Sequence, residues 1–395
     1  MSSAPSSVPL LNISSSSLSR WYIDTRALAS NPSSELPLLS TLRPEDQTKV
    51  KSFYHLPDRC MSLASSLLKY LFIHRACHVP WDKIVISRTP APHKRPCYIP
   101  LSSGGGGESN TNGGRPTTTS HIEFNVSHQA SFVALAGCII LPGQVVPNYD
   151  KPPSPSGGTT AESLNTPPQI GIDITCTDDP ARRKRPDAVP STEEALRAFI
   201  DIFAEVFSAR ELEIMKTASV PADYYPNGRQ LPGSTSQQQY SIIYRLRLFY
   251  TYWALKEAYI KMTGEALLAS WLRELEFTNV SVPKPQEQQE PPVLNDDDEE
   301  GKWGPPETGI HVWLHGKRVT DVRIEVVAFE TDYLVATAGR GGGFGANNAE
   351  TNAADDGQQE EGKSVVEVAE WQDLQRVDIE RDIALCASGE CACLD

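Results

Sequence analysis

The chain has 395 residues, enough for one large domain or two ordinary ones, each with a buried core. Its formal net charge of −14 argues against a protein that coats nucleic acid, because neutralising phosphates requires an excess of Lys and Arg. No apolar run approaches the roughly 18 residues of a membrane span, and the N-terminus lacks the features of a secretory signal. We therefore expect a soluble cytoplasmic protein that uses neither nucleic acid nor a membrane.

Four segments are dominated by Gly, Pro, Ser, Gln or acidic residues and are predicted to be disordered inserts. They are residues 102–119, 142–168, 283–308 and 339–364. Three parts of the chain are predicted on this basis: an N-terminal subdomain at 1–168, a C-terminal subdomain at 169–345, and a partly disordered tail at 346–395 that contains cysteines.

In chain order, the N-terminal part predicts a strand at 21–25 and helices at 43–53 and 58–76, followed by two strands within 121–137 that flank Ser127-His128-Gln129. The C-terminal part predicts a strand at 169–175, helices at 192–207, 208–216 and 240–263, and a sheet formed by 309–315, 320–328 and 333–338. Each half has a long helix and a few strands in mixed order, which favours an α+β fold with a loose internal duplication.

The longest predicted helix carries Trp253, Glu257 and Lys261 at intervals of four, so these side chains line one face. A Glu and a Lys at this spacing ordinarily form a surface ion pair. Here many aromatic residues crowd the same helix, and a charge among apolar groups needs a partner such as a metal ion or a phosphate. Function and core packing both remain open from the helix alone.

The strand Ile170-Gly171-Ile172-Asp173-Ile174 carries one carboxylate between β-branched residues. Such an Asp is often only a turn former or a helix cap. An Asp on a strand together with a Glu on a helix is also a common way to hold Mg²⁺ against a pyrophosphate.

The segment Phe124-Asn-Val-Ser-His-Gln129 places a His beside a Ser, which suggests a hydrolase. However, no Gly-x-Ser-x-Gly motif surrounds Ser127, and neighbours on a strand point to opposite sides. A cradle for a phosphate or an adenosine suits these residues better, with a simple polar turn as the alternative.

The eight cysteines fall into two groups. Five are scattered among apolar neighbours, as buried thiols usually are. The other three, Cys386, Cys391 and Cys393, lie close together near the end of the chain. A metal site there would need a fourth ligand, and no His lies nearby in the sequence, so the tail cysteines are left without an assigned role.

Three of these segments together resemble the 4′-phosphopantetheinyl transferases of the Sfp type. They are Asn125-Val-Ser-His128, Gly171-Ile-Asp173 and Trp253-Ala-Leu-Lys-Glu-Ala-Tyr-Ile-Lys261, which occur in the order and spacing of the family pattern. The stretch from Arg88 to Pro96 is similar to the family's first motif. The resemblance covers roughly residues 40–340 apart from the inserts.

The resemblance implies an α+β, pseudo-duplicated fold of two subdomains and the activity of a holo-[acyl-carrier-protein] synthase. Such an enzyme moves 4′-phosphopantetheine from coenzyme A, its co-substrate, to a serine of an acyl or peptidyl carrier protein. The reaction depends on Mg²⁺ and releases adenosine 3′,5′-bisphosphate. Carriers of fatty-acid, polyketide, nonribosomal-peptide and lysine biosynthesis are all candidate partners, and a monomer is expected. A non-catalytic module that binds coenzyme A or a carrier is the alternative.

The resemblance also implies roles for individual residues. Asp173 and Glu257 match the metal ligands, Glu257 is the candidate general base, and Lys261 would act in catalysis by holding a phosphate oxygen. The remaining residues expected to contact the coenzyme are Lys49, Arg88, Lys94, Arg95, Asn125, Ser127, His128 and Gln129. Lys256 is expected to point away from the site. Thr175 stands where bacterial members have an acidic residue, which puts a third carboxylate ligand in doubt.

Overall fold

The computed structural model describes residues 11, 13–14, 17–30, 35–89, 95–99, 121–140, 166–183, 189–225, 234–265, 269–286, 302–345 and 369–394. Most of the four predicted inserts, and Lys94, lie outside these ranges. Within them, no helix is long and apolar enough to cross a membrane.

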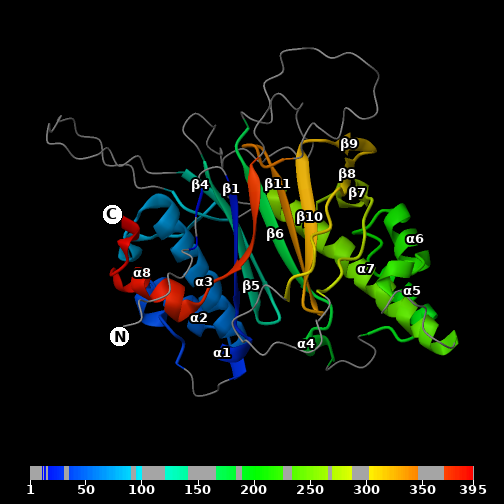
Figure 1. Ribbon diagram of the computed structural model, residues 1–395, viewed down its shortest axis with the longest axis horizontal. Coiled ribbons are helices and arrows are strands. Elements are labelled where there is room, and N and C mark those ends of the chain that lie inside the picture. Colours follow the sequence, from blue (N-terminus) through cyan, green and yellow to red (C-terminus); the bar gives the residue numbers. More distant parts are fainter. Residues whose placement is uncertain are drawn as a thin grey trace, which may run out of the picture.

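The N-terminal half is built on a sheet with the strand order β12-β1-β5-β4. Its strands are β1 (Ser17–Asp24), β4 (His121–Gln129), β5 (Phe132–Ile140) and β12 (Glu370–Arg376). β12 runs parallel to β1, whereas β1, β5 and β4 are antiparallel to one another in turn. The helices of this half are α1 (Arg26–Ser30), α2 (Pro44–Lys51) and the long α3 (Leu56–Cys77), which packs on β5 and β4 (Figure 1).

The C-terminal half contains a second sheet with the order β10-β11-β6. Its strands are β6 (Gln169–Cys176), β10 (Val322–Phe329) and β11 (Tyr333–Arg340). The long helix α7 (Ser234–Thr263) packs on β6 and β11, and α5 (Glu193–Asp201) and α6 (Ala209–Thr217) pack on α7. α7 begins six residues earlier than predicted, and α5 ends at Asp201 instead of residue 207 because the chain turns there and buries Phe207.

The segment 309–315 was predicted to share a sheet with 320–328 and 333–338, and the structure corrects this. β8 (His311–Leu314) instead forms a small sheet with β7 (Leu275–Thr278) and β9 (Lys317–Val319). The reason lies in the turn that follows β8. His315 and Gly316 both have positive φ, as a tight hairpin turn requires, and the chain folds back at once.

The structure also corrects the placement of Ser127-His128-Gln129, which lies inside β4 and not between two strands. The turn that joins β4 to β5 is Ala130-Ser131, where both residues have positive φ. A polar block is typical of a turn, but here the Ser127 and Gln129 side chains accept hydrogen bonds from amides of β6, so the block remains part of the strand.

The remaining elements are short. They are α4 (Pro180–Arg183), α8 (Ala384–Ser388), the strands β2 (Ser87–Arg88) and β3 (Pro96–Cys97), a π-helix at Ile379–Ile383, and 3-10 turns at Leu39–Thr41, Trp81–Lys83, Ala222–Tyr224, Leu272–Glu274 and Ala392–Leu394. The described part of the tail, residues 369–394, folds onto the N-terminal half through β12 and α8.

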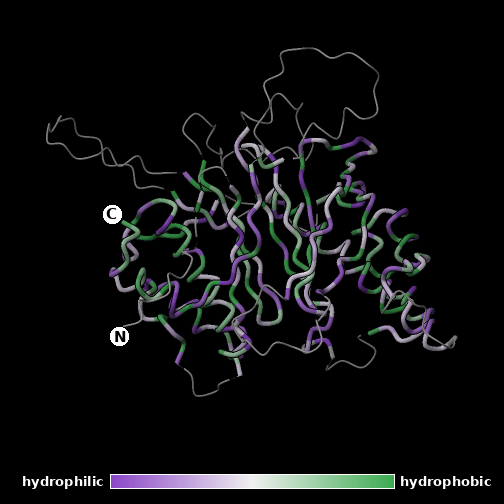
Figure 2. Tube along the Cα trace, viewed as in Figure 1, coloured by the Kyte–Doolittle hydropathy of each residue, from purple (hydrophilic) through white to green (hydrophobic). Residues whose placement is uncertain are grey.

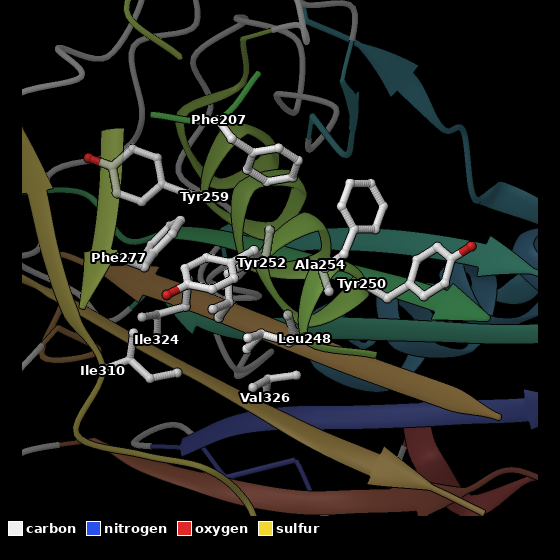
Figure 3. Close-up of a cluster of buried hydrophobic side chains, with 14 of the residues drawn as sticks. Phe207, Leu248, Tyr250, Tyr252, Ala254, Tyr259, Phe277, Ile310, Ile324 and Val326 are labelled. Carbon is white, nitrogen blue, oxygen red and sulfur yellow. The ribbon is translucent and has the colours of Figure 1, made fainter. Parts of the chain in front are cut away.

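The two sheets face each other, so the layers run α3, first sheet, second sheet, α7. Alternation along the strands shows this: Val133 and Leu135 of β5 pack with α3, whereas Phe132 and Ala134 pack against the second sheet. Apolar stretches follow the central strands in Figure 2. On the far side, Leu248, Tyr252 and Tyr259 of α7 belong to the same buried cluster as Ile324 and Val326 of β10 (Figure 3). The predicted pseudo-duplicated α+β fold is confirmed by this repeat of helix on sheet.

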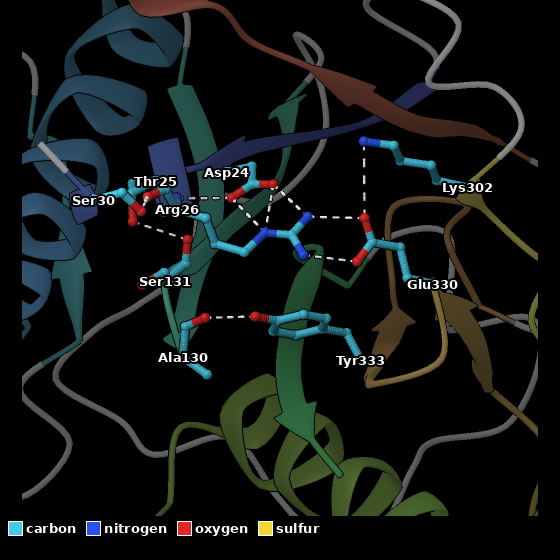
Figure 4. Close-up of polar contacts among 9 residues, drawn as sticks. All are labelled: Asp24, Thr25, Arg26, Ser30, Ala130, Ser131, Lys302, Glu330 and Tyr333. Atoms are coloured by element: carbon cyan, nitrogen blue, oxygen red, sulfur yellow. Dashed lines mark hydrogen bonds and ion pairs between the residues drawn. The ribbon is translucent and has the colours of Figure 1, made fainter. Parts of the chain in front are cut away.

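A polar network joins the two halves beyond the sheets (Figure 4). Arg26 Nη2 lies 2.6 Å from Asp24 Oδ2, and Arg26 Nη1 lies 2.7 Å from Glu330 Oε2. Nearby, the Tyr333 hydroxyl donates to the Ala130 carbonyl at 2.6 Å. These contacts fix the end of β1 and the β4–β5 turn against the β10–β11 turn.

Candidate active site between the two sheets

The edge strands β4 and β6 are joined through side chains, in what we call the β4–β6 seam. Asn125 Oδ1 accepts from the Ile172 amide at 3.2 Å, Ser127 Oγ accepts from the Ile174 amide at 3.2 Å, and Gln129 Oε1 accepts from the Cys176 amide at 2.9 Å. Every second residue of β4 thus supplies an oxygen to every second amide of β6. The seam provides hydrogen-bond acceptors for backbone amides at the edge of the second sheet, which would otherwise be unpaired, and it holds Ser127 beside Asp173.

Asp173 is the centre of a compact polar group. Its Oδ1 accepts from Lys261 Nζ at 2.6 Å and from Ser127 Oγ at 3.2 Å, and its Oδ2 accepts from Thr175 Oγ1 at 2.9 Å. Lys261 Nζ also donates to Ser127 Oγ at 2.9 Å. Only 5% of Asp173 is exposed, so these contacts fix its carboxylate firmly on the face of β6 that meets α7.

Gly171 explains why α7 lies close enough to reach Asp173. A Cβ atom at this position would lie 2.0 Å from the Ala258 carbonyl oxygen and 2.4 Å from the Met262 amide nitrogen. The glycine therefore permits direct contact between helix backbone and strand. Glu257 and Lys261 each come one residue before these contacts, so the close approach brings both side chains near the strand that bears Asp173.

The Glu257 side chain is partly buried and makes no hydrogen bond or ion pair with any residue within the described ranges. Burial, and then the nearby Asp173 carboxylate, raise the pKa of Glu257 to about 7, although Lys261 acts in the opposite direction. The Asp173 and Glu257 carboxylates offer the hard oxygen donors that a divalent cation such as Mg²⁺ prefers. The donor set therefore fits such a cation.

A group of basic side chains gathers near the same site, contributed by α2, α3, β2, β4 and α7: Lys49, Lys69, Arg88, His128 and Lys261. Lys69 is only 7% exposed, and its ammonium group forms no hydrogen bond or ion pair among the described residues. Burial, then Lys49 and Arg88, lower the pKa of Lys69 to about 8, although the Asp46 carboxylate acts in the opposite direction. The His128 side chain is exposed on its strand, but partial loss of solvent and the charges of Lys261, Lys69 and Lys49 lower its pKa. Such a cluster is suited to a ligand with several negative charges.

Sequence reasoning did not identify Lys69. A signal was present, because Lys69 is a lone charge within the apolar run of the helix that contains Leu67, Leu68, Leu71 and Phe72. A buried Lys without a partner in the protein usually has a functional reason.

The structure brings Asp173, Glu257, Lys261 and Ser127 together, as the sequence motifs suggested. Arg95 is instead held by Glu123 at 2.5 Å and by the Ile170 carbonyl at 3.1 Å, so it ties β3 to β4 and β6. Asn125 and Gln129 serve the seam, and their predicted contact with a nucleotide stays a prediction.

The prediction that Lys256 points away is confirmed. Its fully buried ammonium lies 2.9 Å from Glu211 Oε2 and donates to the Leu272 carbonyl at 3.1 Å. Glu211 also completes the capping box of α6 with Ser208, so this ion pair anchors α7 to α6.

The arrangement does not support a Ser–His hydrolase. Ser127 is buried and its hydroxyl donates to Asp173, whereas His128 is exposed on the other face of the strand. No hydrogen bond joins the two in the part of the chain that the structure describes.

Comparison with known proteins supplies a family for these features. The family model of the 4′-phosphopantetheinyl transferase N-terminal domain matches residues 31–140, and that of the 4′-phosphopantetheinyl transferase superfamily matches residues 169–305. The 4′-phosphopantetheinyl transferase A of Aspergillus fumigatus is 52% identical, over 95% of this chain and 96% of its own. The 4′-phosphopantetheinyl transferase NpgA of Emericella nidulans is 47% identical over the same shares. An L-aminoadipate-semialdehyde dehydrogenase-phosphopantetheinyl transferase from rat is 22% identical, over 74% of this chain and 71% of its own.

Proposed function

This chain belongs to the 4′-phosphopantetheinyl transferase family, and we propose that Asp173, Glu257 and Lys261 carry out its transfer of 4′-phosphopantetheine from coenzyme A to a carrier-protein serine. The observation that carries this assignment is the meeting of all three side chains where α7 touches β6 at Gly171. The alternative of a non-catalytic binding module is not favoured, because the relatives are transferases.

We propose Asp173 and Glu257 as the residues that hold Mg²⁺. When bound, the ion would supply positive charge to the pyrophosphate of coenzyme A. Thr175 donates to Asp173 Oδ2, so it orients this carboxylate and does not act as a third acidic ligand. In the structure Lys261 donates to Asp173. If Asp173 binds Mg²⁺, Lys261 becomes available for a phosphate oxygen of the coenzyme.

We assign the phosphates of coenzyme A to the basic cluster. Lys69, whose ammonium group forms no hydrogen bond or ion pair among the described residues, is the strongest candidate, with Lys49, Arg88 and His128 around it. A phosphate placed here would raise the lowered pKa values of Lys69 and His128 and favour their charged forms. Lys94 and Arg95 stay as weaker candidates, since Arg95 already binds Glu123.

In the transfer step, the carrier serine oxygen forms a bond to the phosphorus that bears the pantetheine, and the bond from that phosphorus to the leaving phosphate breaks. The serine proton passes to the Glu257 carboxylate, directly or through one water, and adenosine 3′,5′-bisphosphate leaves. A carboxyl pKa of about 7 in the free protein is close to the value that suits a general base at neutral pH. Lys261 would stabilise charge on the phosphate oxygens.

The decisive experiment mixes the protein with coenzyme A, Mg²⁺ and apo carrier proteins of fatty-acid, polyketide, nonribosomal-peptide and lysine pathways. Mass spectrometry should show one phosphopantetheine added to the carrier serine. Asp173→Ala and Glu257→Ala should each abolish this mass increase while retaining the circular dichroism spectrum of the wild type. Absence of any increase with every carrier would refute the proposal, and coenzyme binding without turnover would support a binding module.

We also propose that the enzyme works as a cytoplasmic monomer, without nucleic acid or a membrane. Support comes from the net charge of −14 and from the presence of both helix-on-sheet halves in one chain. Light scattering coupled to gel filtration would reveal a dimer if this is incorrect.

A further inference from the structure

The three tail cysteines meet a histidine from the distant helix α3. His74 lies near the C-terminal end of α3, and Cys386, Cys391 and Cys393 lie in or just after α8. One ligand atom from each of the four residues can be chosen so that all lie within 4.8 Å of one another. His74 is fully buried, Cys386 is 1% exposed, and the other two are partly buried.

The distances suit a tetrahedral metal site. Cys386 Sγ lies 3.7 Å from Cys393 Sγ, and His74 Nε2 lies 3.0 Å from Cys391 Sγ. Sulfur ligands about 2.3 Å from a zinc ion in a tetrahedron are separated by about 3.8 Å. The four side chains therefore need only small adjustments to surround one ion.

The surroundings of the cluster prepare these side chains for a metal. His74 Nδ1 lies 2.7 Å from the Val79 carbonyl oxygen, a contact that places the hydrogen on Nδ1 and leaves the Nε2 lone pair directed at the cysteines. Arg75 Nη2 lies 3.9 Å from Cys386 Sγ, where a positive charge would help to balance thiolates.

The backbone also brings Cys391 back to the cluster. Gly389 ends α8 with φ of 79°, and the Cys391 amide then donates to the Leu385 carbonyl at 3.1 Å. This turn places Cys391 over the last turn of α8, within reach of both Cys386 and His74.

We propose that His74, Cys386, Cys391 and Cys393 bind one zinc ion in a closed, structural Cys₃His site. Three thiolates and one imidazole are a donor set typical of structural zinc, and with four protein ligands no position is open for a substrate. The ion would fasten the C-terminal tail to α3, in which Lys69 of the basic cluster lies five residues before His74. The site is separate from the Asp173–Glu257 pair, whose oxygen donors suit a harder cation.

The first test measures zinc in the full chain, expressed with a tag that lacks histidine and purified in buffer without chelator. Elemental analysis should find about one zinc per chain. Replacement of zinc by Co²⁺ should produce the thiolate-to-cobalt charge-transfer band and the visible bands of a tetrahedral site. Protein purified from zinc-supplemented medium with less than about a tenth of an equivalent would overturn the proposal.

The variant test uses Cys391→Ser and Cys393→Ser, because both side chains are partly exposed and their replacement leaves no buried cavity. Each should lower the zinc content or zinc affinity at least about tenfold. The matched control is Cys97→Ser, a buried cysteine outside the cluster, which should keep full zinc. Full zinc in a Cys391→Ser, Cys393→Ser double variant would overturn the proposal. So would a native mass lighter by two hydrogens in metal-free protein, which would indicate a disulfide instead.

Discussion

At the scale of the residue, Glu257 makes the stability of the metal-free protein depend on pH. Its pKa is about 7 in the folded protein, against an ordinary value of 4.5. As the pH rises, the unfolded chain loses this proton first, so a raised carboxyl pKa destabilises the folded state. Without a bound cation, stability should therefore fall between about pH 4.5 and pH 7.

Replacing Glu257 by Gln removes this titration. We expect metal-free Glu257→Gln to be more stable than the wild type at pH 8 by about 1–2 kcal/mol, less than the full shift because the side chain is partly solvated. At pH 4 the two should agree within about 0.5 kcal/mol. Urea unfolding in EDTA at both pH values measures this, with the exposed Glu213→Gln as control. Equal stabilities at pH 8 would contradict the raised pKa.

Lys69 should matter for the coenzyme and not for the fold. Lys69→Met removes a buried ammonium that has no partner among the described residues, so we expect KM for coenzyme A to rise about 10- to 100-fold with unchanged or improved stability. Lys51→Met, which removes an exposed charge from the end of α2, is the matched control and should leave KM within about twofold.

The pH dependence of KM separates this role from a purely structural one. Because the pKa of Lys69 is about 8 in the free protein, the wild type should bind coenzyme A more weakly as the pH rises above 8. The Lys69→Met variant should lack that part of the pH dependence. The same slope in both proteins would rule out Lys69 as a phosphate contact.

At the scale of the element, the site depends on how closely α7 approaches β6. Gly171→Ala places a methyl group against the Ala258 carbonyl and must push the helix away. We expect a loss of about 2–3 kcal/mol in stability and of at least about 100-fold in kcat/KM, because Glu257 and Lys261 move with the helix. Kinetics and urea unfolding measure both losses.

The control for this change is Gly316→Ala, where the added Cβ meets no atom within 4 Å but the backbone has positive φ. It should cost about 1 kcal/mol and leave the activity unchanged. If Gly171→Ala were as active as this control, the contact between α7 and β6 would not position the site.

Helices that are determined by residues close together in the sequence were predictable. The helix α6 follows from Ser208 and Glu211, whose side chains make the expected capping box, and α3 follows from its apolar periodicity. The end of α5 was not predictable, because the turn after Asp201 depends on burying Phe207 in a core made by distant segments.

The site was predictable in part for a similar reason. The spacing of four residues predicts that Glu257 and Lys261 lie on the same face of a helix. The seam that positions Asp173 instead depends on side-chain hydrogen bonds between β4 and β6, two strands that are distant in sequence. Nothing in the order of residues indicates that a histidine at 74 would meet a cysteine at 391. Such contacts are set by topology, which local patterns do not encode.

At the scale of the whole molecule, the tail completes the N-terminal half. β12 pairs with β1 in parallel, and Trp371 is buried in the cluster between the two sheets. A chain that ends after residue 368 keeps every proposed catalytic side chain but loses this strand. We expect it to be less stable by at least about 3 kcal/mol, from the lost apolar burial alone.

A chain that ends after residue 378 tests the two parts of the tail separately. It keeps β12 and loses α8 with the three cysteines, so its stability should fall between those of the shorter chain and the full protein. Thermal unfolding of the three proteins measures this order. Equal melting temperatures would show that the tail contributes nothing to the fold.

The β4–β6 seam has a consequence for motion within β6. The amides of Ile172, Ile174 and Cys176 are held by single side chains, whereas the amides between them point to the backbone of β11. A side chain can change rotamer and break its hydrogen bond without any movement of the strand. Amides of β6 that are bonded to side chains should therefore exchange hydrogen for deuterium faster than the amides between them, which are bonded to β11. Gln129→Ala should accelerate exchange at Cys176 and leave Ile172 unchanged. Uniform protection along β6 would mean that the two sheets open only as one unit.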